Sequence, residues 1–338
     1  MQPLVVDQFG VFLGKKSERV RVQKGGEVLI EVPLLDLDHI LIASDGVALS
    51  SDLIYECSTR GIHITFLTGA GEPYATVLSA DLTGTVATRR EQLLAYCDER
   101  GVYLALAFAR GKLANQVNLL RYVAKYRREA HPKVYRELQE AVLEIQDLGM
   151  LLSRVRGPMV DEVRDEIMGI EGRAAKRYWE ALRSIVPPEA AWPGRQGRGA
   201  VDLVNCLLNY GYGILYGQVE RAIVLAGLDP FGGYLHVDRP GKASLTLDLI
   251  EEFRQMVVDR TVLALLGRGV GLGMESEGRL DSPTRKLLAE KIFERLDGEE
   301  PYEGQRHRLR TIVQRQARHL ATFVRRERPQ YKPWIGRW

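Results

Sequence analysis

The spacing of apolar residues changes once along this chain, and that change constrains the fold more than any other feature. Up to about residue 80, runs such as PLVVD, RVRVQ, EVLIEV and IHITFL are rich in β-branched residues and are bounded by Gly, Asp or Pro, as is typical of β-strands. From about residue 90, apolar residues recur every three to four positions, which predicts helices. We therefore expect an α+β multidomain protein, in which a small N-terminal β-strand domain precedes a larger all-α C-terminal catalytic domain.

The same patterns predict four segments along the chain. An N-terminal β domain spans residues 1–80 and contains one helix, in LSSDLIYECSTRG, which begins with capping candidates and ends at Gly61. A linker over 81–90 leads to an α-helical catalytic domain over 91–328. The last segment, 329–338, has two prolines and no periodicity, so we expect a flexible C-terminal tail.

Cysteine usage and the length of apolar runs bear on the compartment. The three cysteines, Cys57, Cys97 and Cys206, lie far apart and outside any short metal-binding spacing, which favours reduced thiols in a cytosolic protein. No basic-then-apolar leader opens the sequence, and its longest uninterrupted apolar run, VYLALAFA, is too short to cross a bilayer. We expect a soluble cytoplasmic protein with no membrane partner.

Positive charge is concentrated in two segments, although the formal net charge is only +3. Residues 306–338 hold ten basic residues and one acidic residue, and residues 110–136 hold eight basic residues, interleaved with tyrosines, against Glu129 alone. A polyanion such as a nucleic acid is a plausible partner for such segments. A solvated basic helix face is the alternative, and charge alone does not decide between the two.

A glutamate interrupts the apolar face of the helix predicted in DEIMGIEGRAAKRYWEAL. Glu171 falls in the middle of one helical stripe, which is formed by Ile167, Met168, Ala174, Ala175, Tyr178 and Leu182. Burying an uncompensated carboxylate costs several kcal/mol, so Glu171 needs a cation, a hydrogen-bond network or a metal ion. Two structural alternatives stay open: a buried ion pair with an arginine, or a helix break at Gly172 that exposes the carboxylate.

The segment YLHVDRPGKASLTLDLIEEFR places a histidine before a turn and three carboxylates on the helix that follows. His236 ends an extended stretch, so its ring is free to face a cleft. On the helix, Glu251 points away from the apolar face. Asp248 lies about 60° around the helix from Glu251, so both carboxylates can face that cleft. The alternative is helix chemistry alone, because acids in a first turn are stabilised by the helix dipole. A lone histidine is likewise more often structural.

One imidazole and two carboxylates, with the remaining positions open, suit a divalent ion that also binds phosphate oxygens. The oxygen ligands favour Mg²⁺ or Mn²⁺, although Zn²⁺ also accepts this ligand set. The sequence around His236 therefore predicts a candidate metal site for phosphate chemistry.

Several motifs, taken together, resemble one known family, the CRISPR-associated spacer integrases, here called the Cas-one family. They are GIEGRAAKRYW around Glu171, GYLHVDRPGKASLTLDLIEEFR around His236, GKLANQ at 111–116, LNYGYGIL at 208–215 and GLDPFGGYLH at 227–236. In the first eighty residues, VPLLDLDHILI and GIHITFL also fit the family's β domain. The resemblance spans essentially the whole chain.

The resemblance implies roles for the acidic and histidine side chains. Glu171, His236 and Glu251 would be the metal ligands, with Mg²⁺ or Mn²⁺ as the cofactor. Asp248 matches a second acidic position that some members use and would join them as a catalytic residue, whereas Glu252 would be a neighbour on the helix surface. His236 could instead serve as a general base, because a neutral imidazole does only one of these jobs at a time.

The resemblance also implies the reaction and the partners. The 3′ hydroxyl of a captured DNA fragment would attack a phosphodiester at the edge of a CRISPR repeat, and endonuclease cleavage would use the same site with water. The chain would form a homodimer, and two dimers would flank a dimer of the partner protein, Cas-two, in a heterohexamer. Double-stranded DNA, both spacer precursor and repeat, would be the substrate.

Seven basic residues are candidates for DNA contact: Lys112, Arg121, Lys125, Arg239, Lys242, Arg315 and Arg318. We expect mostly phosphate contacts from them, hence an affinity for DNA that falls steeply with salt. Two other functions stay open at this point. One is a generic metal-dependent nuclease or phosphatase that needs no partner, and the other is a DNA-binding scaffold whose acids are structural.

Overall fold

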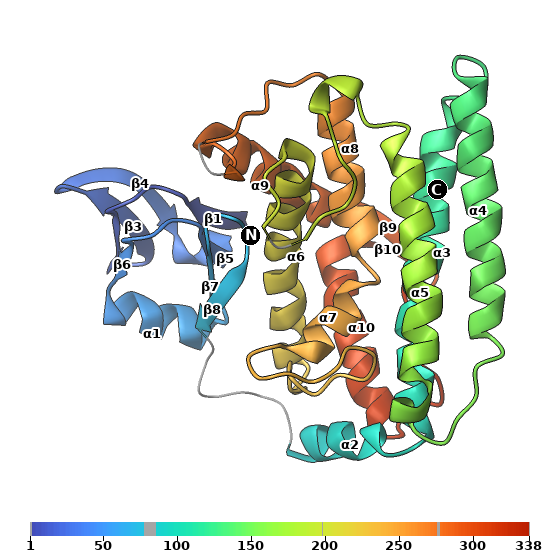
Figure 1. Ribbon diagram of the computed structural model, residues 1–338. Helices are drawn as coiled ribbons and strands as arrows, with labels where there is room; N and C mark the ends of the chain where they lie inside the picture. The colour runs from blue at the N-terminus through green and yellow to red at the C-terminus, as the bar shows by residue number, and fades with distance from the viewer. Residues whose placement is uncertain (1, 78–85, 198, 276–277, 338) are drawn as a thin grey trace. The chain divides into compact units, whose positions relative to one another are not determined.

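The computed structural model describes residues 2–77, 86–197, 199–275 and 278–337, which form two compact units (Figure 1). The strands are β1 (Gln2–Val6), β2 (Phe12–Lys16), β3 (Arg19–Lys24), β4 (Glu27–Pro33), β5 (Leu37–Ile42), β6 (Ala48–Leu49), β7 (His63–Leu67), β8 (Pro73–Val77), β9 (Glu299–Tyr302) and β10 (Gln305–Arg308). The helices are α1 (Ser51–Arg60), α2 (Val86–Tyr96), α3 (Glu99–Lys125), α4 (Pro132–Leu152), α5 (Val160–Arg183), α6 (Leu203–Leu225), α7 (Ser244–Ile250), α8 (Arg260–Gly267), α9 (Ser282–Asp297) and α10 (Leu309–Val324). The predicted class is confirmed, with one addition: the helical part contains the hairpin β9–β10.

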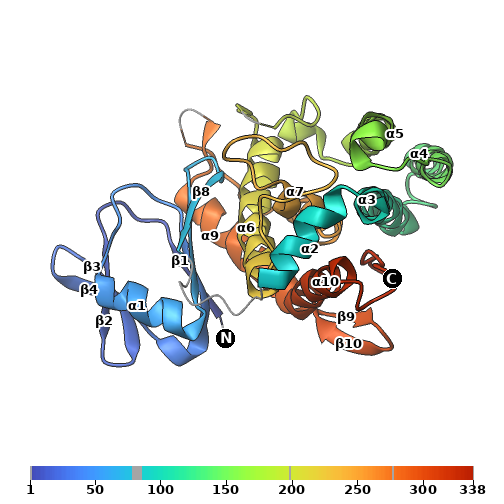
Figure 2. The ribbon, with the colours of Figure 1, turned by 90° about the horizontal axis from the view of Figure 1, so that it is seen from below.

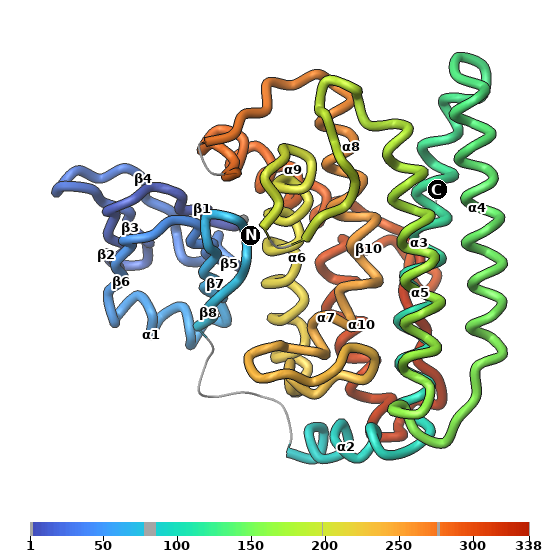
Figure 3. The backbone as a smooth tube through the Cα atoms, viewed as in Figure 1, coloured from blue at the N-terminus to red at the C-terminus, as the bar shows by residue number. Residues whose placement is uncertain are grey.

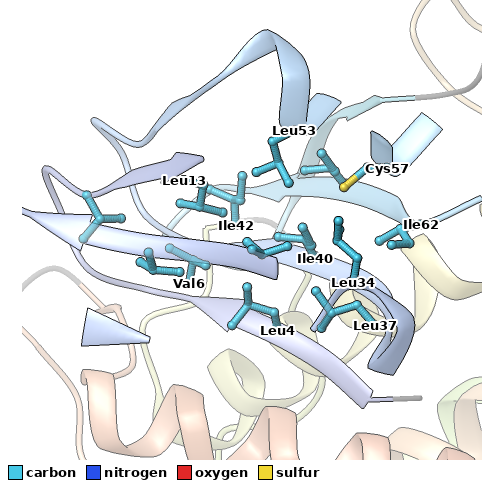
Figure 4. Packing of buried hydrophobic residues seen from close by; sticks show 14 residues of the cluster. Leu4, Val6, Leu13, Leu34, Leu37, Ile40, Ile42, Leu53, Cys57 and Ile62 are labelled. Carbon is cyan, nitrogen blue, oxygen red and sulfur yellow. The ribbon is translucent and has the colours of Figure 1, made fainter. Parts of the chain in front are cut away.

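The first unit is built on two four-stranded sheets. One has the order β1-β5-β7-β8, with β1, β5 and β7 parallel and β8 antiparallel, and the other has the order β4-β3-β2-β6. In β3 the buried side chains alternate with more exposed ones, as the period of two predicts. Apolar side chains from both sheets and from α1 form one core, which includes Leu4, Leu13, Ile40 and Leu53 (Figure 4).

The ends of α1 follow directly from its sequence. The hydroxyl of Ser50 accepts a hydrogen bond from the Leu53 backbone N–H at 3.4 Å and caps the first turn. At the other end, Gly61 adopts a left-handed φ of 68° and its N–H donates to the last carbonyls of the helix. The predicted helix and its end at Gly61 are confirmed.

Two later segments belong to the first unit, whose described residues lie within Met1–Leu82, Gly197–Gly217 and Gly271–Phe293. Every residue of β5 is buried, so both faces of this strand are covered. One close contact explains a glycine: a Cβ on Gly213 of α6 would lie 1.7 Å from the carbonyl oxygen of Gly71. The compact units are therefore not contiguous in sequence, and the predicted domain boundaries remain a prediction.

The second unit is mainly helical, and its described residues lie within Thr83–Gln196, Gln218–Val270 and Glu294–Trp338. Helices α3, α4 and α5 pack against one another and run side by side, as seen end-on in Figure 2. Helix α10 carries an apolar face that includes Leu309, Ile312 and Leu320, all fully buried. Between α7 and α8 the chain forms a π-helix over Gln255–Asp259 in which every residue is buried.

The C-terminal segment is packed within the second unit, so the prediction of a flexible tail over 329–338 was wrong. Tyr331 and Trp334 are only 1% and 3% exposed, and the described part of the segment is bonded to α3 through Trp334 and Gly336 (Figure 3). The amide of Asn115 on α3 donates to the carbonyl of Trp334 at 3.0 Å and accepts from the N–H of Gly336 at 2.9 Å. Prolines and the absence of a period exclude a helix here, but they do not exclude an extended segment held by side chains.

Other predictions are settled only in part. Of the predicted linker over 81–90, residues 81–85 lie outside the described residues and 86–90 belong to α2. The three cysteines are free. In the described part of the chain, no helix combines the length and the apolar character that crossing a membrane requires.

Candidate metal and phosphate site

Three charged side chains from separate elements meet inside the second unit. Lys112 comes from α3, Glu171 from α5, and Glu251 from the turn that follows α7. The ammonium of Lys112 contacts Glu171 Oε1 and lies 3.0 Å from Glu251 Oε2. The Lys112 and Glu171 side chains are only 14% and 13% exposed, and that of Glu251 is 2% exposed. The two predicted carboxylate ligands therefore share one cation.

The local fold at Glu171 decides between the alternatives left open by the sequence. Helix α5 continues through Gly172 without a break. Ile167, Ala174, Tyr178 and Leu182 are buried on its inner face as predicted, whereas Met168 is 37% exposed. The carboxylate is compensated by an ion pair, but its partner is Lys112 rather than an arginine. The burial of Glu171 is thus made tolerable by a cation, as the physical argument requires.

Opposite charges control the ionisation of this group of residues. Burial alone would raise the pKa of Glu251, but the charges of Arg254, Lys112 and His236 lower that pKa to about 2. Burial likewise opposes the charge on Lys112, but the carboxylates of Glu251 and Glu171 raise its pKa above the usual value. Glu251 therefore remains a carboxylate and Lys112 an ammonium at neutral pH.

His236 and Asp248 form a second pair in the same unit. The ring Nδ1 of His236 lies 2.7 Å from Asp248 Oδ1, and the same carboxylate accepts backbone N–H bonds from Tyr234, Leu235 and His236 at 2.6–3.0 Å. Close approach makes this possible, because a Cβ on Gly233 would lie 2.6 Å from the carbonyl carbon of Ser244. Asp248 is fully buried and is bonded at both oxygens, so the prediction that it faces the cleft beside Glu251 was wrong: it positions the histidine.

Glu252 is the largest error of the sequence prediction, which placed it on the helix surface. It is fully buried, and its carboxylate accepts hydrogen bonds from the Tyr331 hydroxyl, from Gln316 Nε2 at 2.7 Å and from the Trp334 N–H at 2.7 Å. Nearly every residue from α7 through the π-helix is buried, so a position opposite the apolar face does not necessarily face water. Glu252 therefore holds the C-terminal segment in place and does not lie on the solvent-facing side of a helix.

Two residues of the site were not identified from the sequence. Arg254 Nη1 donates to Glu251 Oε1 at 2.6 Å, a contact that the spacing of three residues on a helix could have suggested. Asn115, in the motif GKLANQ, donates to the Glu252 carbonyl at 2.8 Å. In the same motif, a Cβ on Gly111 would lie 2.8 Å from Pro333. The motif therefore joins α3 both to the site and to the C-terminal segment.

The seven candidate DNA contacts fall into three groups. Lys112 is buried in ion pairs, so it is not an exposed DNA contact in this state. Arg121, Lys125, Arg239 and Arg318 are exposed, and Lys242 and Arg315 are half-buried. Some arginines of the basic segment 306–338 are already paired within the second unit. Arg310 bonds to Asp297 at 2.7 Å, and Arg328 bonds to Glu303 at 2.8 Å. DNA contact by the exposed residues stays a prediction.

An Asp248→Asn variant should bind a divalent ion more weakly and unfold more easily. The amide has one acceptor oxygen in place of two, so it leaves buried N–H groups unpaired, at a cost of about 1–3 kcal/mol. Loss of the bond to Nδ1 should weaken metal affinity by about 10- to 100-fold, as for other groups that orient a metal-binding histidine. Urea unfolding and Mn²⁺ titration measure both effects. Asp238→Asn, an exposed carboxylate in the same loop, is the control, and equal behaviour of the two variants would refute this role.

Glu171, Glu251 and His236 are of the types that bind a divalent cation, but in this structure they do not form a complete ligand set. Glu171 Oε1 and Glu251 Oε2 already share a positive charge, and the bond from Nδ1 to Asp248 leaves Nε2 of His236 as the donor nitrogen. In the described ranges, however, no three His, Cys, Asp or Glu side chains are arranged to hold a metal ion. The carboxylate pair thus fits, and Lys112 occupies the position between its two members.

Comparisons with known proteins agree on one family. The family model described as "CRISPR associated protein Cas1" matches residues 4–293. A relative from Archaeoglobus fulgidus, a CRISPR-associated endonuclease Cas1, is 40% identical, and the alignment covers 99% of each chain.

Two solved structures share the fold of this chain. One is a casposase bound to an integration product, with a TM-score of 0.83 and 22% identity over 98% of this chain and 93% of the other. The other is a Cas6-RT-Cas1–Cas2 complex, with a TM-score of 0.79 and 18% identity over 99% of this chain and 36% of the other. At these identities the likeness concerns the fold.

Proposed function

This chain belongs to the Cas1 family of CRISPR-associated proteins, and on that premise we propose that it inserts spacer DNA into a CRISPR array as a divalent-metal-dependent integrase and endonuclease. We further propose Glu171, His236 and Glu251 as the metal ligands, with Mg²⁺ or Mn²⁺ as the ion. One observation supports this assignment most: carboxylates from two separate elements share a single cation inside the unit.

In the proposed reaction, the 3′ hydroxyl of the incoming DNA attacks a phosphodiester at the repeat edge. A new phosphorus–oxygen bond forms as the bond to the repeat's own 3′ oxygen breaks, and attack by water in place of the hydroxyl gives hydrolysis. A divalent ion bound at the site would neutralise charge on the phosphate and orient the attacking oxygen.

Each residue of the candidate site has a defined task in this proposal. Glu171 and Glu251 present one carboxylate oxygen each toward the shared cation position. Asp248 bonds to Nδ1 of His236 and so orients the ring with Nε2 as the nitrogen that would bind the metal ion. Arg254 holds the second oxygen of Glu251, which leaves a defined oxygen for the ion.

The proposed partners are double-stranded DNA, a second copy of this chain and the Cas2 protein (Cas-two). The arrangement is a heterohexamer in which two dimers of this chain flank a Cas2 dimer. Support comes from the fold shared with a casposase on an integration product and with a Cas1–Cas2 complex. The exposed basic side chains of Arg121, Lys125 and Arg318 supply the charge that DNA binding requires.

The direct test is a strand-joining assay. Purified protein with its Cas2 partner is incubated with a labelled duplex and a plasmid that carries the CRISPR repeat, with Mg²⁺, Mn²⁺ or EDTA. We expect joined products at repeat edges with either ion, none in EDTA, and none from a duplex with 3′-deoxy ends. Cleavage without joining would indicate a generic nuclease, and DNA binding without any metal-dependent chemistry would indicate a scaffold.

A further inference from the structure

Lys112 is largely buried between two carboxylates, unlike an exposed lysine that binds DNA phosphates. Its side chain is only 14% exposed, and its ammonium contacts one oxygen of Glu171 and one oxygen of Glu251. Glu251 would offer Oε2 to a metal ion, since its Oε1 is held by Arg254, and Glu171 Oε1 faces the same position. The ammonium and the ion therefore compete for the same place.

Charge balance indicates which cation leaves when a metal ion binds. In the described state, the negative charges of Glu171 and Glu251 are matched by Lys112 and Arg254. A divalent ion adds two positive charges, and like charges this close in a buried site repel strongly. Arg254 contacts the oxygen that faces away from the shared position, so it can stay. Lys112 lies between both carboxylates, so it must move.

We propose that Lys112 is a resident counter-ion, which holds Glu171 and Glu251 together in the metal-free protein and is displaced when a divalent ion binds. The inference rests on the proposed function, because it uses the same two carboxylates as metal ligands. It also accounts for the incomplete ligand set. While the ammonium occupies the shared position, the two carboxylates and the imidazole are not arranged as a metal site.

A resident counter-ion has two opposing effects on the protein. It stabilises the metal-free fold, because two buried carboxylates facing each other without a cation would repel. It also weakens metal binding, because part of the binding free energy is spent on separating the ammonium from its partners. A lysine with a purely structural role would have the first effect without the second.

The test compares Lys112→Met with wild type in the full-length chain, using Mn²⁺ alone as the probe and no DNA. The Met stem fills a similar volume without charge. We expect a lower Tm than wild type in EDTA, a larger rise in Tm on adding Mn²⁺, and a Kd for Mn²⁺ about tenfold smaller. Electron paramagnetic resonance of free Mn²⁺ gives the Kd. Lys176→Met is the matched control, since Lys176 is 79% exposed on α5, and it should bind Mn²⁺ as wild type does.

Lys112→Arg provides a test that survives poor folding of the Met variant. A guanidinium binds carboxylates through two N–H groups and keeps its charge, so it should be harder to displace and should raise the Kd for Mn²⁺. Unchanged or weaker Mn²⁺ binding by Lys112→Met, or equal or tighter binding by Lys112→Arg, would overturn the inference. An equal loss of Tm with and without Mn²⁺ would do the same.

The fate of the proposed function is read separately. If wild type fails to bind Mn²⁺, or if Glu251→Gln binds it as wild type does, the proposed metal site itself fails. If wild type binds Mn²⁺, Glu251→Gln does not, and Lys112→Met equals wild type, the site stands and only the role of Lys112 is refuted.

Discussion

Glu251→Gln and Glu171→Gln should each reduce metal-dependent cleavage and strand joining by about a thousandfold or more. Glutamine keeps the shape of the side chain and one oxygen acceptor but removes the negative charge that a divalent ion requires. Glu251→Gln should lose the most activity, because Glu251 is 1% exposed and its pKa of about 2 keeps the carboxylate charged across the pH range in which the reaction is assayed. DNA binding should change little, because the exposed basic residues are untouched.

The matched control is Glu180→Gln, which removes a carboxylate from the same helix as Glu171. Glu180 is 53% exposed and lies 4.0 Å from Lys176, a pair worth little at the surface. Rates are measured in the strand-joining assay with Mg²⁺ and with Mn²⁺, and folding is checked by thermal unfolding in EDTA. Rates in Glu251→Gln within tenfold of wild type, with normal folding, would show that Glu251 is not a ligand.

The sequence was sufficient to predict that Glu171 needs a cation, for a reason that lies in a single residue. A carboxylate at position 171 on an otherwise apolar helix face needs a cation, and the structure provides one in Lys112. The two periods of the apolar residues predicted the fold class, and the capping residues predicted the limits of α1. These features depend on local sequence, which is why they could be read without a structure.

The errors concern residues whose environment is set by distant segments. Periodicity treats one face of a helix as buried and the other as exposed, but from α7 through the π-helix every residue except the half-buried Leu247 and Arg254 is buried. Glu252 therefore meets Tyr331 and Trp334, which are some eighty residues away in sequence. Asp248 likewise turns toward the backbone of 234–236. No local pattern carries information about such partners.

Glu252 should make the stability of the protein fall as the pH rises from about 4.5 to 7. Burial raises the pKa of this carboxyl to about 7, whereas the unfolded chain releases the proton near 4.5. The stabilisation from the protonated carboxyl is therefore complete below about pH 4.5 and is lost as the pH rises through about 7. The shift corresponds to about 3 kcal/mol of unfolding free energy.

Glu252→Gln isolates this effect, because the amide is neutral at every pH and can still accept a hydrogen bond from the Trp334 N–H. The difference in unfolding free energy between the variant and wild type should grow by about 3 kcal/mol from pH 4.5 to 8, with the variant gaining. Taking the difference cancels other titrating groups, such as His319, whose pKa is lowered by burial. Urea unfolding at four or five pH values measures it, with tryptophan fluorescence as the probe because Trp334 packs in this segment. A difference that stays constant with pH would mean that Glu252 is charged throughout, held by its three donors rather than neutralised by burial.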